Sequence, residues 1–292
     1  MVEYNPRDWF SLIFKFHKGD TLNILWPGMI TVAIYTATIV YIERNVFNIV
    51  NSAVIHSLLA FVISLLLVFR TNTAYERWWE GQKLWTQLSA SIRNISFKLN
   101  GLLPSEMESD KEKFFLLISN YPYSIINQLQ KNTLIKHYKI SEKYPLTTFT
   151  NTEHAPNKIL TILYEEIVQL RKIDVIDSTQ MRLLDIDIAQ LNLISNNCER
   201  IKSTPIPYSY SMFLKKFLFA YILTLPFGFG EQLGYYLAPI VSFVFYVLLS
   251  LELIAASIED PFGNDTEDLP LLDMSNKIRQ EAAEIMSVGC GC

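Results

Sequence analysis

Residues 52–85 read SAVIHSLLAFVISLLLVFRTNTAYERWWEGQKLW, and this stretch decides the fold. Its first part, Ser52–Phe69, is 18 residues long and contains no charged residue, which makes it a candidate transmembrane helix. The second part mixes charged residues with three tryptophans, and Gly81 is its only residue of poor helix propensity. The pattern therefore predicts one helix that spans a membrane and continues beyond it into the cytoplasm.

Two further apolar runs fit the same interpretation. Asn23–Ile42 is uncharged and would measure about 30 Å as a helix, enough to cross a hydrocarbon core. Glu43–Asn51 is a short connection, so this run and the next predict a helical hairpin. Leu233–Leu251 is another long apolar run, with Pro239 near its start.

A fourth run, Phe217–Phe229, is apolar but short. We expect its helix-breaking residues to interrupt it: Pro226, Gly228 and Gly230. Extension back to Tyr208 gives enough length, but it places Lys215 and Lys216 in the span, where they would have to reach an interface. We therefore expect an all-α integral membrane protein with four transmembrane helices in each subunit.

Composition supports a membrane protein and narrows its function. Hydrophobic residues make up 50% of the 292 residues and charged residues 18%, against about 25% charged in ordinary soluble domains. The net charge of −4 gives no reason to expect nucleic-acid binding. No phosphate-binding loop, zinc motif or nucleophile elbow occurs in the sequence, so we expect no enzyme. Cys290 and Cys292 form a terminal Gly-Cys-Gly-Cys sequence without a histidine nearby.

The distribution of Lys and Arg predicts the orientation. Of the 25 such residues, only Arg44 falls in the tip of a predicted hairpin. The positive-inside rule then places both termini and residues 70–205 in the cytoplasm of a cell whose inner membrane holds the protein. Asp8–Phe16 is expected to form an amphipathic helix on the membrane surface.

The predicted organisation has five segments. Residues 1–22 form an interfacial segment, 23–70 the first hairpin, 71–207 a cytoplasmic helical region, 208–256 the second hairpin and 257–292 a cytoplasmic C-terminal segment. Apolar residues at three- and four-residue spacing predict three further cytoplasmic helices. These cover Glu112–Lys131 (kinked or split at Pro122), Ala155–Lys172 and Ser178–Ile201.

Three motifs, in this order, resemble the bacterial branch of the bestrophin family. The first is FRTNTAYERWWEGQKLW at residues 69–85, which departs from the family's recurring form at Gln82. The second is CERIKSTPIP at residues 198–207, and the third is IEDPFGNDTEDLP at residues 258–270. The resemblance covers most of the chain and implies a homopentameric ion channel around one axial pore, with lipid and small ions as its other partners.

The resemblance also implies a narrow pore neck at Phe61, Leu65 and Phe69. Their spacing of four places them on one stripe of a helix, which agrees with this role. Rings of apolar side chains block ions by excluding water, and small helix movements open them. The alternative is that the three side chains face lipid or a neighbouring helix.

Two further sites follow from the resemblance. A second constriction, the cytoplasmic aperture, falls between Thr179 and Leu184, with Gln180, Met181 and Arg182 as candidates. A calcium site corresponds to Asp260, Asp265 and Asp268, because oxygen ligands suit Ca²⁺. Thr266 and Leu269 interrupt the acidic run, and a capped, solvated turn is the alternative.

The function implied by the resemblance is a channel for chloride and other small anions, and some bacterial relatives favour monovalent cations instead. Two functions of other classes stay open. One is a membrane-anchored helical scaffold or signalling protein. The other is a metabolite transporter, for which the Pro and Gly residues near 226–228 are a hint.

Overall fold

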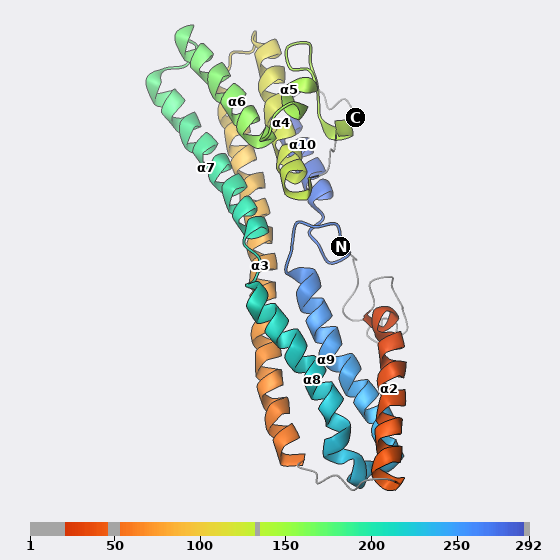
Figure 1. The fold of residues 1–292 in the computed structure, drawn as a ribbon. Helices are drawn as coiled ribbons and strands as arrows, with labels where there is room; N and C mark the ends of the chain where they lie inside the picture. Colours follow the sequence, from red (N-terminus) through yellow and green to blue (C-terminus); the bar gives the residue numbers. More distant parts are fainter. Residues whose placement is uncertain (1–20, 46–52, 132–134, 289–292) are drawn as a thin grey trace. The chain divides into compact units, whose positions relative to one another are not determined.

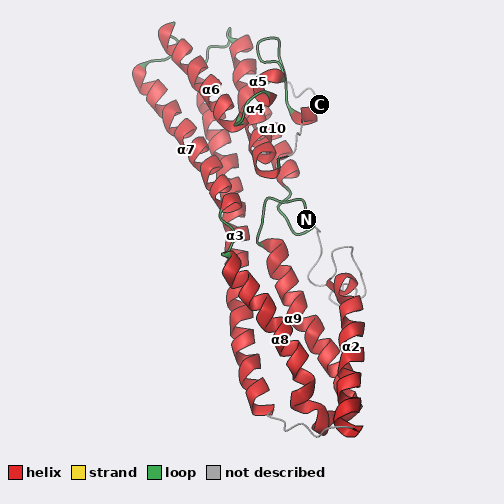
Figure 2. Ribbon diagram, in the orientation of Figure 1, coloured by secondary structure: helices red, strands yellow, loops and turns green. Residues whose placement is uncertain are grey.

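The computed structural model describes residues 21–45, 53–131 and 135–288. Every regular element within these residues is a helix, as Figure 2 shows. The predicted surface helix Asp8–Phe16 and the Cys290/Cys292 tail lie outside the described residues. The chain divides into two compact units. The first unit holds the chain up to Trp78 with residues 205–260 and 265–267, and the second holds residues 79–204, 261–264 and the chain from Asp268 onward.

Four helices of the first unit are long and apolar enough to cross a membrane, which confirms the prediction of four spans. They are α2 (Thr21–Asn45), the first half of α3 (Ala53–Leu102), α8 (Tyr208–Leu233) and α9 (Leu237–Ile258), all labelled in Figure 1. A short 3₁₀ turn, η2 (Gly234–Tyr236), joins α8 to α9. The first unit is therefore an all-helical membrane-spanning unit.

The continuity of α3 was also predicted correctly. It runs without a break for 50 residues, so the uncharged segment and the tryptophan-rich segment form one helix. Gly81 allows a close approach, since a Cβ there would lie 3.0 Å from Pro261 and 3.2 Å from Phe262 and these side chains would have to shift. A larger residue would push this turn of α3 away from the third motif.

The prediction that the third span is interrupted was wrong, because α8 continues through Pro226 and both glycines to Leu233. Side chains of other helices bond two carbonyl groups shortly before the proline, as is common where a proline lies within a transmembrane helix. The hydroxyl of Tyr35 donates to the carbonyl of Leu223 at 2.9 Å, and Nε2 of His56 bonds the carbonyl of Thr224 at 2.9 Å. The alternative prediction, in which the third span begins at Tyr208, is confirmed.

The fourth span begins at Leu237 and not at Leu233, because Gly234 ends α8. Its φ of +54° is a backbone conformation that glycine adopts without steric cost. A Cβ at Gly234 would lie 2.2 Å from the guanidinium of Arg44, so this turn also packs closely against the end of α2. The hairpin tip is thus fixed by a close backbone approach.

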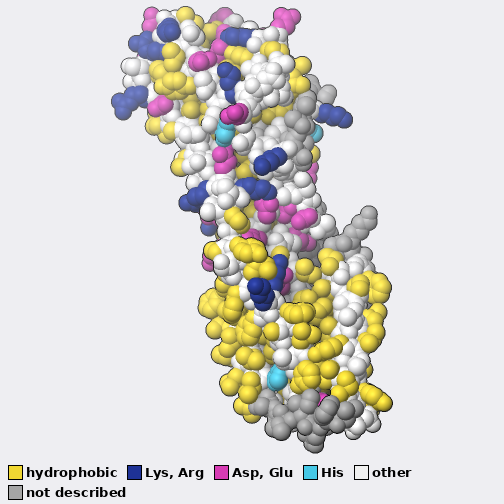
Figure 3. All heavy atoms as spheres, in the orientation of Figure 1, with side chains coloured by type: hydrophobic (Ala, Val, Ile, Leu, Met, Phe, Trp, Pro, Cys, Tyr) yellow, Lys and Arg dark blue, Asp and Glu magenta, His cyan; other side chains and the backbone are white. Residues whose placement is uncertain are grey.

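The four spans enclose an apolar core. Its buried residues come from all four helices and include Val40, Ile63, Leu67, Leu218, Leu237 and Val241. The helix α2 packs on α9 and α8, and α8 packs on α9. On the face shown in Figure 3, hydrophobic side chains also cover most of the outer surface of these spans, as expected of a unit surrounded by lipid.

The second unit is a helical bundle. It contains the end of α3 together with α4 (Glu108–Gln130), α6 (Ala155–Lys172), α7 (Ser178–Ser203) and α10 (Leu271–Met286). Two short elements, η1 (Ile135–His137) and α5 (Thr147–Thr150), lie between α4 and α6. The predicted helices at 155–172 and 178–201 are confirmed, and α4 is not split at its proline.

The core of the second unit is formed around α4, which is buried almost continuously from Phe114 to Ile126. It packs on α6 and α10, and α6 packs on α7. The end of α3 contributes buried side chains at three- and four-residue spacing: Trp85, Leu88, Ile92, Ile95 and Leu99. Lys98 on α3 forms a 2.7 Å ion pair with the mostly buried Asp187 on α7, so a charge pair also joins these helices.

Candidate functional site

The first half of α3 presents a stripe of exposed apolar side chains, here called the neck stripe. It consists of Phe61, Leu65 and Phe69, which are 69%, 47% and 57% exposed. On the opposite face of the same helix, Ile63 and Leu67 are fully or almost fully buried in the core of the unit. The three predicted neck residues therefore share one face that no part of the described subunit covers.

The neck stripe lies in the middle of the exposed face of α3. Successive stripe residues advance by about 40° around the helix, because an α-helix has 3.6 residues per turn. Val62 and Val68, which flank the stripe on either side, are exposed as well. A helix that packs correctly within a monomer buries its large apolar residues, so this face is suited to contact lipid, another subunit or a dewetted passage.

The same face becomes polar directly beyond Phe69. Asn72 and Glu76 continue the stripe by one and two turns, and both are exposed. A carboxylate that follows an apolar constriction on the same face acts on the ions that approach it. The sequence analysis did not identify Glu76 as a site residue.

A clamp of hydrogen bonds holds α3 at the end of the neck stripe, and Glu259 is its centre. The guanidinium Nη2 of Arg70 donates to Oε2 of Glu259 at 2.7 Å. The backbone N–H of Ile206 donates to the other carboxylate oxygen, Oε1, at 2.9 Å. The backbone carbonyl of Glu259 accepts a 2.9 Å hydrogen bond from Nε of Arg77. One residue thus binds α3 at two positions two turns apart.

A further bond strengthens this arrangement. The indole Nε1 of Trp78 donates to the backbone carbonyl of Glu267 at 3.1 Å. Arg70, Arg77 and Trp78 belong to the first motif, Ile206 to the second, and Glu259 and Glu267 to the third. The three motifs, which are far apart in sequence, therefore meet at the residue after Phe69. No sequence pattern indicates that Glu259 is the shared partner.

Arg70 depends strongly on this clamp. Its side chain is 3% exposed, and among the described residues its Nε and Nη1 atoms have no hydrogen-bond partner. A buried guanidinium is costly to desolvate unless a carboxylate compensates its charge. The Glu259 carboxylate, which is itself mostly buried, supplies that compensation.

The segment predicted to hold the aperture is the start of α7. Asp177 caps this helix by accepting from the N–H of Gln180 at 2.7 Å, and the Gln180 side chain accepts from the N–H of Asp177 at 2.8 Å. This capping box occupies the side-chain carbonyl of Gln180. Met181 is half-buried and Arg182 is exposed, which leaves Arg182 the most accessible of the three candidates.

The acidic residues predicted to bind calcium have different environments. Asp265 is exposed, Asp260 is half-buried and Asp268 is buried. The first two belong to the membrane-spanning unit and the third to the helical bundle. Within the residues that the structure describes, no group of three or more His, Cys, Asp or Glu side chains is placed to hold a metal ion. Calcium binding therefore stays a prediction, and no step of the proposed function depends on it.

Comparisons of the sequence with known proteins support the family resemblance that the three motifs indicated. A family model described as bacterial/fungal bestrophin protein matches residues 1–284. A voltage-dependent anion channel-forming protein of Nostoc sp. is 28% identical over 97% of this chain and 93% of its own length. A protein of the same description from Synechocystis sp. is 29% identical over 91% of this chain and 88% of its own length.

Solved structures give the same result for the fold. The chain is similar to the crystal structure of a bacterial bestrophin homologue from Klebsiella pneumoniae, with a TM-score of 0.81 and 26% identity. The match covers 89% of this chain and 98% of the Klebsiella chain. A second structure of the Klebsiella protein, which carries a point mutation, gives a TM-score of 0.83 at 24% identity.

Proposed function

The chain belongs to the bacterial and fungal bestrophin family, and on this premise we propose that it is one subunit of a pentameric ion channel with a single axial pore. The observation that carries the proposal is the neck stripe of α3. Phe61, Leu65 and Phe69 are large, apolar and exposed, and they lie at the centre of the uncovered face of their helix. Five copies of this face around one axis would form three successive apolar rings.

Such rings control ion conduction by determining whether water fills the pore. An ion that enters a narrow apolar ring must lose hydration without gaining protein ligands, which is costly. A small rotation or tilt of α3 that widens the rings lets water and ions return. Two tethers favour a defined position of α3 within each subunit: the Glu259 clamp, and a 3.1 Å hydrogen bond from the Tyr210 hydroxyl to the carbonyl of Leu66. We infer that movements of the segment after α9 change the width of the neck through this clamp.

The orientation that we propose places both termini and the helical bundle in the cytoplasm and the protein in the inner membrane. The distribution of Lys and Arg supports it, since Arg44 is the only one of 25 in a hairpin tip. Ions would then leave the neck past Asn72 and Glu76 on the cytoplasmic side. The aperture at the start of α7 would follow, with Arg182 as its most exposed candidate.

Anion conduction is the first choice for the permeant ion, because the named relatives are anion channel-forming proteins. One observation favours the second choice, a channel for monovalent cations. Glu76 is exposed on the face that carries the neck stripe, and a ring of its carboxylates would attract cations. A ring of Arg182 would have the opposite effect, so the balance of these two positions sets the selectivity.

The proposal is tested by reconstituting the purified protein in planar bilayers with unequal KCl concentrations on the two sides. Unitary current steps are expected, and the sign of the reversal potential identifies the permeant ion. Native mass spectrometry of the same preparation is expected to give a pentamer. Silent bilayers that contain inserted pentamers would contradict the channel and favour the scaffold function.

A further inference from the structure

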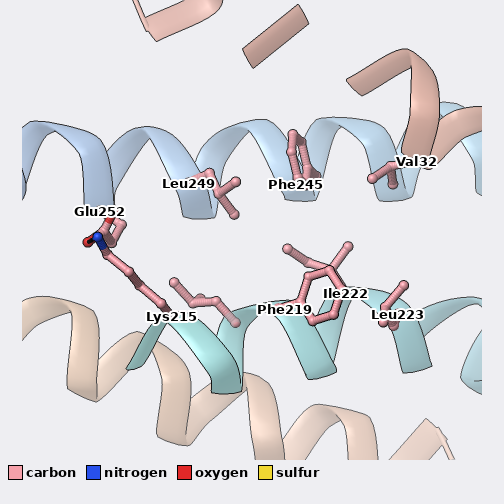
Figure 4. A pocket seen from close by; sticks show the side chains of 9 residues that line it. Val32, Lys215, Phe219, Ile222, Leu223, Phe245, Leu249 and Glu252 are labelled. Atoms are coloured by element: carbon pink, nitrogen blue, oxygen red, sulfur yellow. Dashed lines mark ion pairs between the residues drawn. The ribbon is translucent and has the colours of Figure 1, made fainter. Parts of the chain in front are cut away.

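A cavity of about 310 Å³ lies within the membrane-spanning unit, outside the neck stripe and the clamp. Figure 4 shows it between α8 and α9, with Val32 of α2 at one end. Its walls are almost entirely apolar and include Leu218 and Ile222 from α8 and Phe245 and Leu249 from α9. A cavity of this size and lining is suited to a slender apolar molecule.

The other end of the cavity is charged. Lys215 of α8 and Glu252 of α9 meet there, with Nζ 3.5 Å from Oε1. The Lys215 side chain is 52% exposed, whereas that of Glu252 is only 9% exposed. Oε1 of Glu252 accepts no hydrogen bond from any residue that the structure describes. A buried carboxylate oxygen with unused acceptor capacity is costly, and a ligand with hydrogen-bond donors removes that cost.

The charged pair of Lys215 and Glu252 lies near one end of the two spans. Lys215 lies in the second turn of α8, and Glu252 lies in the last two turns of α9, so both are at the same ends of the two spans. From Lys215 to Leu223 the cavity follows α8 for eight residues, or about 12 Å along the helix. The cavity therefore begins at a membrane–water interface, where a lysine reaches polar groups, and extends into the hydrocarbon region.

We propose that this cavity binds a membrane phospholipid with a phosphoethanolamine head. One acyl chain lies between α8 and α9, the phosphate binds Lys215, and the primary ammonium donates to Glu252. The three N–H donors of a primary ammonium match the unused acceptor of the buried carboxylate. A choline head has no such donors and a glycerol head has no cation, so the pair selects among phospholipids of the same leaflet. The inference depends on the four membrane spans and is independent of ion conduction.

The test measures lipid retention and not current. The purified pentamer is delipidated, incubated with one phospholipid class of fixed acyl length, and examined by native mass spectrometry. We expect phosphatidylethanolamine to be retained about tenfold better than phosphatidylcholine or phosphatidylglycerol, as one charge-assisted hydrogen bond predicts. Glu252→Gln is expected to reduce ethanolamine retention to the choline level, and Lys215→Met to reduce retention of all three classes.

Lys216→Met is the matched control, because Lys216 is the neighbouring exposed lysine and does not line the cavity. It is expected to leave retention unchanged. Equal retention of the three classes by the unmodified protein, or an equal effect of Lys216→Met and Lys215→Met, would overturn the proposal.

A second measurement needs no variant. A phosphatidylethanolamine with a photoreactive acyl chain is expected to label α8 or α9 at the cavity wall, with Phe245 or Leu249 among the modified residues. Labelling confined to α3, or cross-links that place a second subunit in the cavity, would also contradict the proposal.

Discussion

Nη2 of Arg70 lies 2.7 Å from Oε2 of Glu259, and 189 positions separate the two residues in the sequence. Arg70 directly follows Phe69, the last residue of the neck stripe. The pair therefore connects the end of the proposed constriction to the segment that follows the fourth span. It gives the third motif a structural role that does not require a bound metal.

The first prediction concerns the stability that this pair supplies. Glu259→Ala leaves a buried guanidinium without its carboxylate, and we expect the free energy of unfolding to fall by about 3–5 kcal/mol. Thermal unfolding of the detergent-solubilised protein measures the change. Glu267→Gln is the control, because the backbone carbonyl of Glu267, and not its exposed carboxylate, accepts the bond from Trp78. Equal melting temperatures for the two variants would show that the clamp contributes little.

The second prediction concerns the apolar rings. Combined alanine substitution of Phe61, Leu65 and Phe69 is expected to raise the open fraction in bilayer recordings about tenfold, which corresponds to about 1.4 kcal/mol in the free-energy difference between the closed and open states. Phe243, Val247 and Leu251 of α9 provide a matched control triple, since they are exposed apolar residues with the same spacing on another span. The control triple is expected to conduct as the parent protein does. If both triples behave alike, the stripe faces lipid.

The third prediction concerns selectivity. In the proposed pentamer, Glu76→Gln removes a ring of carboxylates from the exit of the neck, and we expect the ratio of cation to anion permeability to fall about tenfold. The reversal potential in unequal KCl measures this ratio. Glu106→Gln is the control, because it removes an exposed charge from the connection between α3 and α4. An unchanged reversal potential in Glu76→Gln would place this residue outside the ion pathway.

The fourth prediction concerns the thiol of Cys198, which lies on α7 within the helical bundle. It is fully buried, and burial, together with the nearby carboxylates of Glu199 and Glu80, raises the pKa of Cys198 to about 12. At pH 8 only about one thiol in ten thousand is then ionised. In a variant with serine at positions 290 and 292, we expect no alkylation by iodoacetamide in the folded protein. Denaturant should restore ordinary reactivity, and rapid labelling of the folded protein would contradict the packing of α7.

The spans could be predicted because a membrane imposes a simple length rule on apolar sequence. The continuity of α3 was predictable for a related reason, since Gly81 is the only glycine and no proline occurs from Thr73 to Leu99. The neck stripe was implied by the family resemblance, and its spacing of four agreed with that prediction. The exposure of these three side chains within the subunit agrees with that prediction.

The remaining features depend on contacts between distant residues. The side chains that bond carbonyl groups just before Pro226 of α8, Tyr35 and His56, come from other helices and carry no signal in the local sequence. The role of Glu259 depends on Arg70, Ile206 and Arg77 meeting it in space. The ethanolamine site depends on Lys215 and Glu252, which lie on different spans. Periodicity reports which face of a helix is apolar, but not which distant group completes a polar contact.

The most direct test of the pore uses a single cysteine on the neck stripe. Leu65→Cys is introduced into the variant with serine at positions 290 and 292, and Val247→Cys in the same background is the control. A positively charged methanethiosulfonate reagent is then added during bilayer recording. The account predicts an irreversible change of current in Leu65→Cys and none in Val247→Cys. Modification of Leu65→Cys, verified by mass, that leaves the current unaltered would contradict the assignment of this stripe to the pore.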